Sequence, residues 1–160
     1  MARPTILCPM DQERLCMVLG GLPGTIRAFM KPRVYDVLFT TRRIVGVARG
    51  GVPSIAFLGG ALVAAMVLRG EAEAQRRNPL PYDVNQLDQY LRADPNGFAV
   101  DYAAIRKARV YTSTLEYIVE LKTTDKRKIG LVVSRKEEAN AVRNLLSHFA
   151  GAAYSASQFM

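Results

Sequence analysis

The sequence predicts one α+β domain: a partly open antiparallel β-barrel or sandwich with a C-terminal capping helix and an inserted helical region. Short strand-like segments separated by polar turns lie on both sides of an apolar, helix-favouring stretch at about residues 50–95. An amphipathic helix follows the last strand, where it can close one end of a curled sheet. We expect an N-terminal extension at 1–22, the domain at 23–150 and a tail at 151–160 of the 160 residues.

The first half of the chain predicts a β-hairpin. Residues 34–40, VYDVLFT, are rich in strand-favouring side chains, which should point to two faces in turn. A polar break separates this segment from a second strand at 44–48. Upstream, the Leu-Pro-Gly at 22–24 predicts a turn, and residues 25–30 predict a short first strand.

The insertion begins with an uncharged run at 50–68 and continues as a predicted helix from 54 to about 77, where Asn-Pro-Leu-Pro ends it. Small residues recur along this helix every four positions, and such a strip lets another backbone approach closely. The members of this strip are Ala56, Gly60 and Ala64.

Three environments can cover this apolar helix. It can pack on the barrel or on a second copy of the chain, or it can contact lipid as a re-entrant or interfacial helix. A membrane span is the least favoured, because strands on both sides of the run must share one compartment to form one barrel. The arginines on its two flanks are also balanced in number, so the positive-inside rule assigns no orientation.

The second half predicts a short helix followed by a β-meander. Asp83 can cap a helix at 84–91, and Asp-Pro-Asn-Gly at 94–97 is a turn signal. Strands are expected at 98–101, 108–113, 114–123 and 128–133. In the third of these, alternation places Leu115 on the same face as Tyr117, Val119 and Leu121.

The last element predicts an amphipathic helix. Ser134 and Glu137 match a capping box with Ser134 as the N-cap, and Gly151 suits the C-terminal end. One apolar stripe follows helical spacing along it: Ala139, Val142, Leu145, Leu146 and Phe149.

Residues 35–45, YDVLFTTRRIV, and residues 98–105, FAVDYAAI, carry a family resemblance. They resemble the strand–turn–strand and the later strand entry of the pleckstrin-homology-like superfamily, in particular its bacterial and archaeal GRAM-like members. The resemblance covers about residues 25–150, including a Gly/Ala-rich inserted helix, and departs from the commonest eukaryotic pattern because the final helix lacks Trp. It implies a barrel that binds lipid head groups, peptides or copies of itself, and it implies no catalysis.

Basic residues gather in the predicted turns of a chain whose net charge is +8. Such a surface attracts phosphate groups. The candidates for an anion or lipid site are Lys31, Arg33, Arg42, Arg43, Lys126, Arg127 and Lys128. Further basic residues, Arg106, Lys107 and Arg109, precede or begin a strand. Several of these clusters would form one anion site if they converged at one barrel mouth.

No motif for nucleotide binding, metalloprotease or hydrolase chemistry occurs, and one histidine and two cysteines match no dyad or zinc pattern. We therefore expect no enzyme activity, no cofactor and no metal. The leading hypothesis is a binding module in the cytoplasm or peripherally on its membrane, recognising anionic lipid or a protein partner. The alternative is a self-assembling interaction domain that uses the strip at 56, 60 and 64. Nucleic-acid binding is disfavoured, because the basic clusters lack interleaved aromatic residues.

Overall fold

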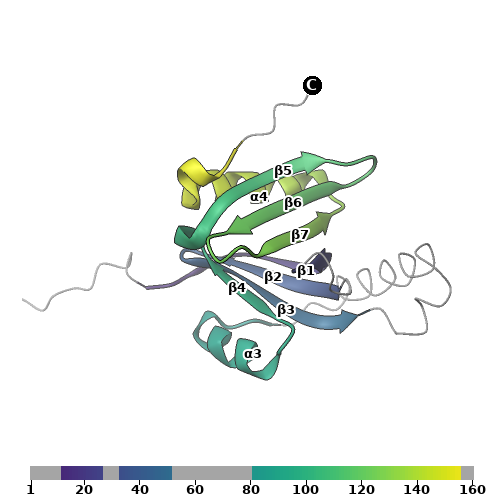
Figure 1. Cartoon of the computed structure of the whole chain (residues 1–160). Coiled ribbons are helices and arrows are strands. Elements are labelled where there is room, and N and C mark those ends of the chain that lie inside the picture. Colours follow the sequence, from purple (N-terminus) through teal and green to yellow (C-terminus); the bar gives the residue numbers. More distant parts are fainter. Residues whose placement is uncertain (1–11, 27–32, 52–80, 156–160) are drawn as a thin grey trace, which may run out of the picture.

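The computed structural model describes residues 12–26, 33–51 and 81–155 of the chain (Figure 1). Seven strands form one curled antiparallel sheet in the order β4–β3–β2–β1–β7–β6–β5. The strands are β1 (Leu15–Thr25), β2 (Arg33–Thr40), β3 (Arg43–Gly51), β4 (Phe98–Asp101), β5 (Ile105–Thr112), β6 (Tyr117–Thr123) and β7 (Lys128–Val133). The α-helices of the described residues are α3 (Leu87–Ala93) and α4 (Lys136–Phe149), and 3-10 turns occur at Val84–Gln86, Tyr102–Ala104 and Gly151–Ala153. The expected α+β fold with a half-open antiparallel barrel is confirmed.

The main core lies between the inner face of the curled sheet and α4 (Figure 1). Inward residues of β5, β6 and β7 alternate with outward ones, and they meet the apolar stripe of α4. Within that stripe Ala139, Val142 and Leu146 are fully buried, as the helical spacing predicts. The Gly151 that follows α4 adopts a φ of 55°, the left-handed conformation expected just after a helix end.

A second, smaller core covers the outer face of β2 and β3. Leu87 of α3 packs there on Leu38 and Val45, and all three side chains are buried. Two polar contacts hold this region in place: the Tyr82 hydroxyl donates to the carboxylate of Asp36, and the backbone N–H of Ala48 donates to Asp94 at 2.7 Å. Because both of its faces are covered, β2 is buried from Val34 to Thr40.

The strand β1 differs most from the sequence prediction. The turn expected at 22–24 is wrong, because these residues continue β1 in register with β2, and Gly24 also pairs with Leu131 of β7. The irregularity lies earlier, between Leu19 and Leu22, where Gly21 has a φ of 67° and donates its N–H to Asp36 at 3.0 Å. Residues 15–22, assigned above to an extension, therefore lie within the sheet.

Three smaller expectations also change. Strand β6 begins at Tyr117, so Leu115 lies in the β5–β6 loop and not on a strand face. The N-cap of α4 is Arg135 without a side-chain cap, so the predicted Ser134 cap is wrong. Residues 151–155 are not a loose tail, because a 3-10 turn is followed by a bridge between Tyr154 and Ala108 of β5.

Other predictions fall outside the described residues. The helix expected at 54–77, its strip of Ala56, Gly60 and Ala64, and Lys31 all lie there. Among the helices within 12–26, 33–51 and 81–155, none is long and apolar enough to cross a bilayer.

Candidate anion-binding site

The pairing of β5, β6 and β7 brings three lysines into one row on the outer face of the sheet. Lys107 lies opposite Lys122, and Lys122 lies opposite Lys128. Neighbouring strands are about 4.8 Å apart, and like charges placed directly opposite each other destabilise a sheet. All three lysines are exposed, which limits the repulsion without removing it. We call these residues the lysine row.

A bulge at the start of β5 adds a fourth cation. The register shifts between Ile105 and Lys107, so Arg106 is an extra residue on this strand. Arg106 and Lys107 are both exposed, whereas their neighbours Ile105 and Ala108 are buried. The bulge therefore gives two successive basic side chains an outward position, which regular alternation would forbid.

The turn between β6 and β7 presents two more cations beside the row. Lys126 has a φ of 67°, a conformation that non-glycine residues seldom adopt. The turn is fixed around Thr123: its carbonyl accepts from Lys126 N–H at 3.1 Å, its N–H donates to the Arg127 carbonyl at 3.0 Å, and its hydroxyl donates to Asp125. That hydroxyl bond, together with the charge of Arg127, lowers the pKa of the Asp125 carboxyl.

These elements surround an open pocket of about 710 Å³. One wall is the segment after α4, where the N–H of Ser155 donates to the Ala108 carbonyl at 3.0 Å. The lining residues are Arg106, Lys107, Lys122, Thr123, Lys126, Arg127, Lys128, Ala152, Ala153 and Ser155. We call this the basic pocket, since six of these side chains are cationic.

The six cations of the basic pocket are not equally available. Arg127 is held by Asp125, with Nε to Oδ2 at 2.8 Å, and its guanidinium also donates to the Ala99 carbonyl in β4 at 3.3 Å. Lys128 lies 3.3 Å from Glu120. By contrast, Arg106, Lys107, Lys122 and Lys126 form no ion pair with any residue in the described part of the chain. These four positive charges are free to meet an anionic ligand.

Glu120 lies beside the lysine row and holds two cations in place. Its carboxylate accepts from Arg109 Nε at 2.9 Å as well as from Lys128. Burial by itself would raise the pKa of the Glu120 carboxyl, but the hydrogen bonds and charges of these two partners lower it overall. Glu120 is therefore an anion at neutral pH, and its charge is balanced by Arg109, which does not line the pocket.

The sequence candidates separate into those at the pocket and those elsewhere. Lys126, Arg127 and Lys128 line it, as do Arg106 and Lys107. Lys122 was missed, because only the register of β6 against its two neighbours shows that it completes the row.

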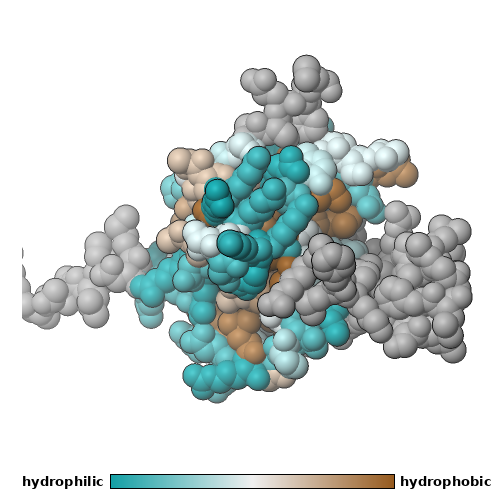
Figure 2. All heavy atoms as spheres, viewed as in Figure 1, coloured by the Kyte–Doolittle hydropathy of each residue, from teal (hydrophilic) through white to brown (hydrophobic). Residues whose placement is uncertain are grey.

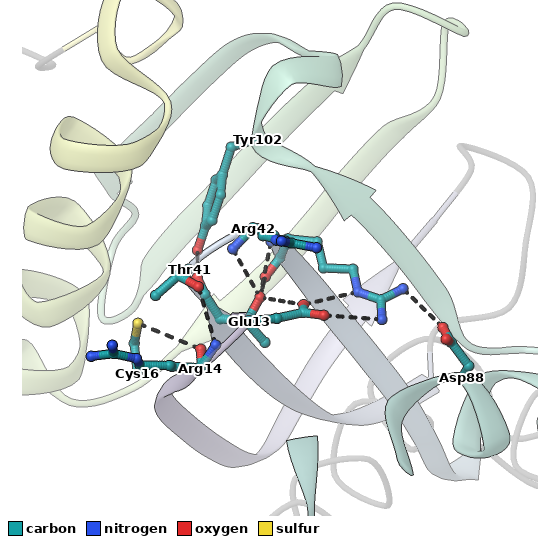
Figure 3. A network of polar contacts seen from close by, with 9 residues as sticks. Glu13, Arg14, Cys16, Thr41, Arg42, Asp88 and Tyr102 are labelled. Atoms are coloured by element: carbon teal, nitrogen blue, oxygen red, sulfur yellow. Dashed lines mark hydrogen bonds and ion pairs between the residues drawn. The ribbon is translucent and has the colours of Figure 1, made fainter. Parts of the chain in front are cut away.

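Arg42 and Arg43 lie at the β2–β3 turn and do not line the pocket. The Arg43 guanidinium is already neutralised, with Glu13 at 3.0 Å and Asp88 of α3 at 3.1 Å. Figure 3 labels these two acidic partners and marks their contacts by dashed lines. Arg33 begins β2 and is partly exposed. Anion binding by Arg33, Arg42 and Arg43 stays a prediction.

Comparisons with known proteins add little to this geometry. No family model and no curated protein matches the sequence. Among solved structures, the chain is similar to the C-terminal domain of an unknown protein from Leishmania infantum, with 12% sequence identity and a TM-score of 0.46. The match covers 86% of this chain and 84% of that one.

Proposed function

We propose that this protein is a non-enzymatic binding module that recognises the phosphate groups of anionic lipids at the cytoplasmic membrane surface. The pleckstrin-homology-like assignment implied by the strand motifs is part of this proposal, and the half-barrel closed by α4 supports it. The observation that carries the proposal is the convergence of four cations without ion pairs, Arg106, Lys107, Lys122 and Lys126, on one pocket.

The charge balance of the pocket favours a ligand with several negative charges. Six cations line the pocket, and two neighbouring carboxylates pair with two of them: Asp125 with Arg127 and Glu120 with Lys128. Repulsion among these cations lowers the free energy of unfolding. A ligand that neutralises them removes this repulsion, and the relief adds to the binding free energy. A basic residue close to an anionic bilayer contributes about 1 kcal/mol, so the four unpaired cations contribute on the order of 4 kcal/mol. The expected association is reversible and sensitive to salt.

Sedimentation with vesicles tests the proposal. The protein should sediment with phosphatidylcholine vesicles that contain an anionic lipid, in low salt, and not with vesicles of phosphatidylcholine alone. Replacing two residues of the lysine row, Lys107→Ala and Lys122→Ala together, should weaken partitioning roughly 30-fold, because two contributions of about 1 kcal/mol are lost.

The matched control removes two exposed cations from other surfaces, Arg92→Ala in α3 and Lys136→Ala at the start of α4. Its partitioning should fall by less than about threefold, through net charge alone. Soluble pyrophosphate should compete with the vesicles if the pocket recognises phosphate itself. Absence of binding to anionic vesicles in low salt would refute the proposal. Equal losses of binding in the two double variants would show that the basic pocket is not the lipid-binding site.

A further inference from the structure

The outer face of β5, β6 and β7 changes character along the strands. The lysine row is followed by a middle row of Arg109, Glu120 and Gly130, and then by a third row across the same strands. This third row consists of Tyr111, Ile118 and Val132, each half-buried. Figure 2 shows hydrophilic surface and a hydrophobic patch side by side over this part of the sheet. A free phosphate ion would gain no binding energy from contact with the apolar row.

The β5–β6 loop extends the apolar end of this face. Leu115 lies in this loop with 85% of its surface exposed, and the other exposed large apolar side chain within the described residues is Val18 of β1, at 37%. The N–H of Ser113 donates to the Glu116 carbonyl at 2.7 Å, which closes the loop tightly and holds Leu115 outward. An exposed leucine at a fixed hairpin tip gains free energy from any apolar medium that covers it.

We propose that the domain docks on an anionic bilayer with the β5–β7 face inclined to the surface, so that Leu115 inserts beneath the phosphate groups that the lysine row contacts. The docking mode rests on the function proposed above. In this mode the bilayer is the partner of the whole face. Lipid phosphates contact the lysine row, and the boundary between the headgroups and the acyl chains contacts Tyr111, Ile118 and Val132.

The dimensions of the face suit this arrangement. Four residues along a strand separate the lysine row from the apolar row, which is about 13 Å at 3.3 Å per residue, and Leu115 lies four residues beyond Tyr111, so the loop tip is up to about 26 Å from Lys107. The headgroup region is roughly 5–8 Å deep on each side of a bilayer. An inclined sheet therefore spans this region, with its cations at phosphate level and the loop tip at the acyl boundary. The charge of Glu116, beside Leu115, must stay at headgroup level, which limits the insertion to the tip.

The sequence contains no tryptophan, which permits a direct test. Leu115→Trp places one fluorescent reporter at the loop tip, and Val18→Trp places one at an exposed apolar position of β1. With anionic vesicles, the emission of the Leu115→Trp protein should shift to the blue and be quenched by brominated acyl chains. The emission of the Val18→Trp protein should do neither. An unshifted Leu115→Trp spectrum on sedimented protein would overturn the docking mode and leave the proposed function standing. Failure of every variant to sediment would refute the function itself.

A second pair of variants separates the bilayer from a soluble anion. Leu115→Ser should weaken vesicle partitioning about tenfold and leave pyrophosphate affinity within about twofold, because the loop lies outside the basic pocket. Val18→Ser should change neither quantity. If Leu115→Ser binds vesicles as the parent protein does, the leucine does not insert and the docking mode is wrong. A protein partner for this face then becomes the better hypothesis.

Discussion

The two halves of the curled sheet differ in how far their outer faces are buried. In the half made of β1–β4, α3 covers the outer face of β2 and β3, and Leu38 and Val45 have no exposed surface. In the half made of β5–β7, the corresponding face carries the lysine row and the basic pocket. Continuous burial along β2 therefore marks a face used for stability, while outward residues of β5–β7 that stay exposed or half-buried, such as Lys122 and Val132, mark a face available for binding.

The largest difference between the halves should appear when an outward apolar side chain is shortened. Leu38→Ala, beneath α3, should lower the free energy of unfolding by about 3 kcal/mol, because it leaves a cavity in a closed cluster. The matched change Ile118→Ala, on the half-buried outer face of β6, should cost about 1 kcal/mol. Urea titrations measure both values. Equal losses would mean that the outer face of β6 is as well covered as that of β2.

An intermediate effect is expected at Glu120. Glu120→Gln should lower the free energy of unfolding by about 1 kcal/mol at neutral pH, a figure kept small because both partners are partly exposed. The lowered pKa means that this stabilisation is present above the carboxyl's ordinary pKa and is lost as pH falls through the lowered one. The two proteins should therefore converge in stability on acidification, as thermal unfolding at several pH values would show. Vesicle binding by the variant should not fall, because no cation is removed and Lys128 loses its anionic partner. Weaker binding would mean that Glu120 positions these cations for the ligand.

Lys126 should affect stability and binding in opposite directions. Lys126→Gly should raise the free energy of unfolding by about 0.5–1 kcal/mol, because glycine adopts a positive φ without steric cost. The same change should weaken binding to anionic vesicles, because one unpaired cation is removed from the pocket. Urea unfolding and vesicle sedimentation measure the two quantities. A variant that is less stable than the parent would show that the Lys126 side chain stabilises the turn.

The smallest expected change in stability concerns the centre of the lysine row. Lys122→Ala should alter the free energy of unfolding by a few tenths of a kcal/mol, in the stabilising direction, because repulsion from Lys107 and Lys128 is relieved. The stabilisation should shrink in high salt, which screens exposed charges. Urea titrations at two salt concentrations test this, and a loss that does not depend on salt would indicate that the Lys122 stem packs on its neighbours.

Local periodicity was sufficient for most of the fold and insufficient for the site. The strand at 128–133 and the helical stripe from Ala139 to Phe149 depend on nearby residues, and both predictions are confirmed. The row that contains Lys122 depends on the pairing of three strands, and the outward position of Arg106 depends on a bulge. Neither can be read from one segment of sequence. Alternation also extended the sixth strand too far, and so it concealed the exposure of Leu115.

The bulge at Arg106 and Lys107 has a consequence for solubility. An open sheet leaves unpaired N–H and carbonyl groups on its two outermost strands, and such strands can recruit other chains into aggregates. Here one outermost strand, β4, has four residues, and the other, β5, begins with a charged bulge and is bridged at Ala108 by Tyr154. The irregularity that supplies two cations to the pocket therefore also makes β5 a poor template for edge-to-edge association.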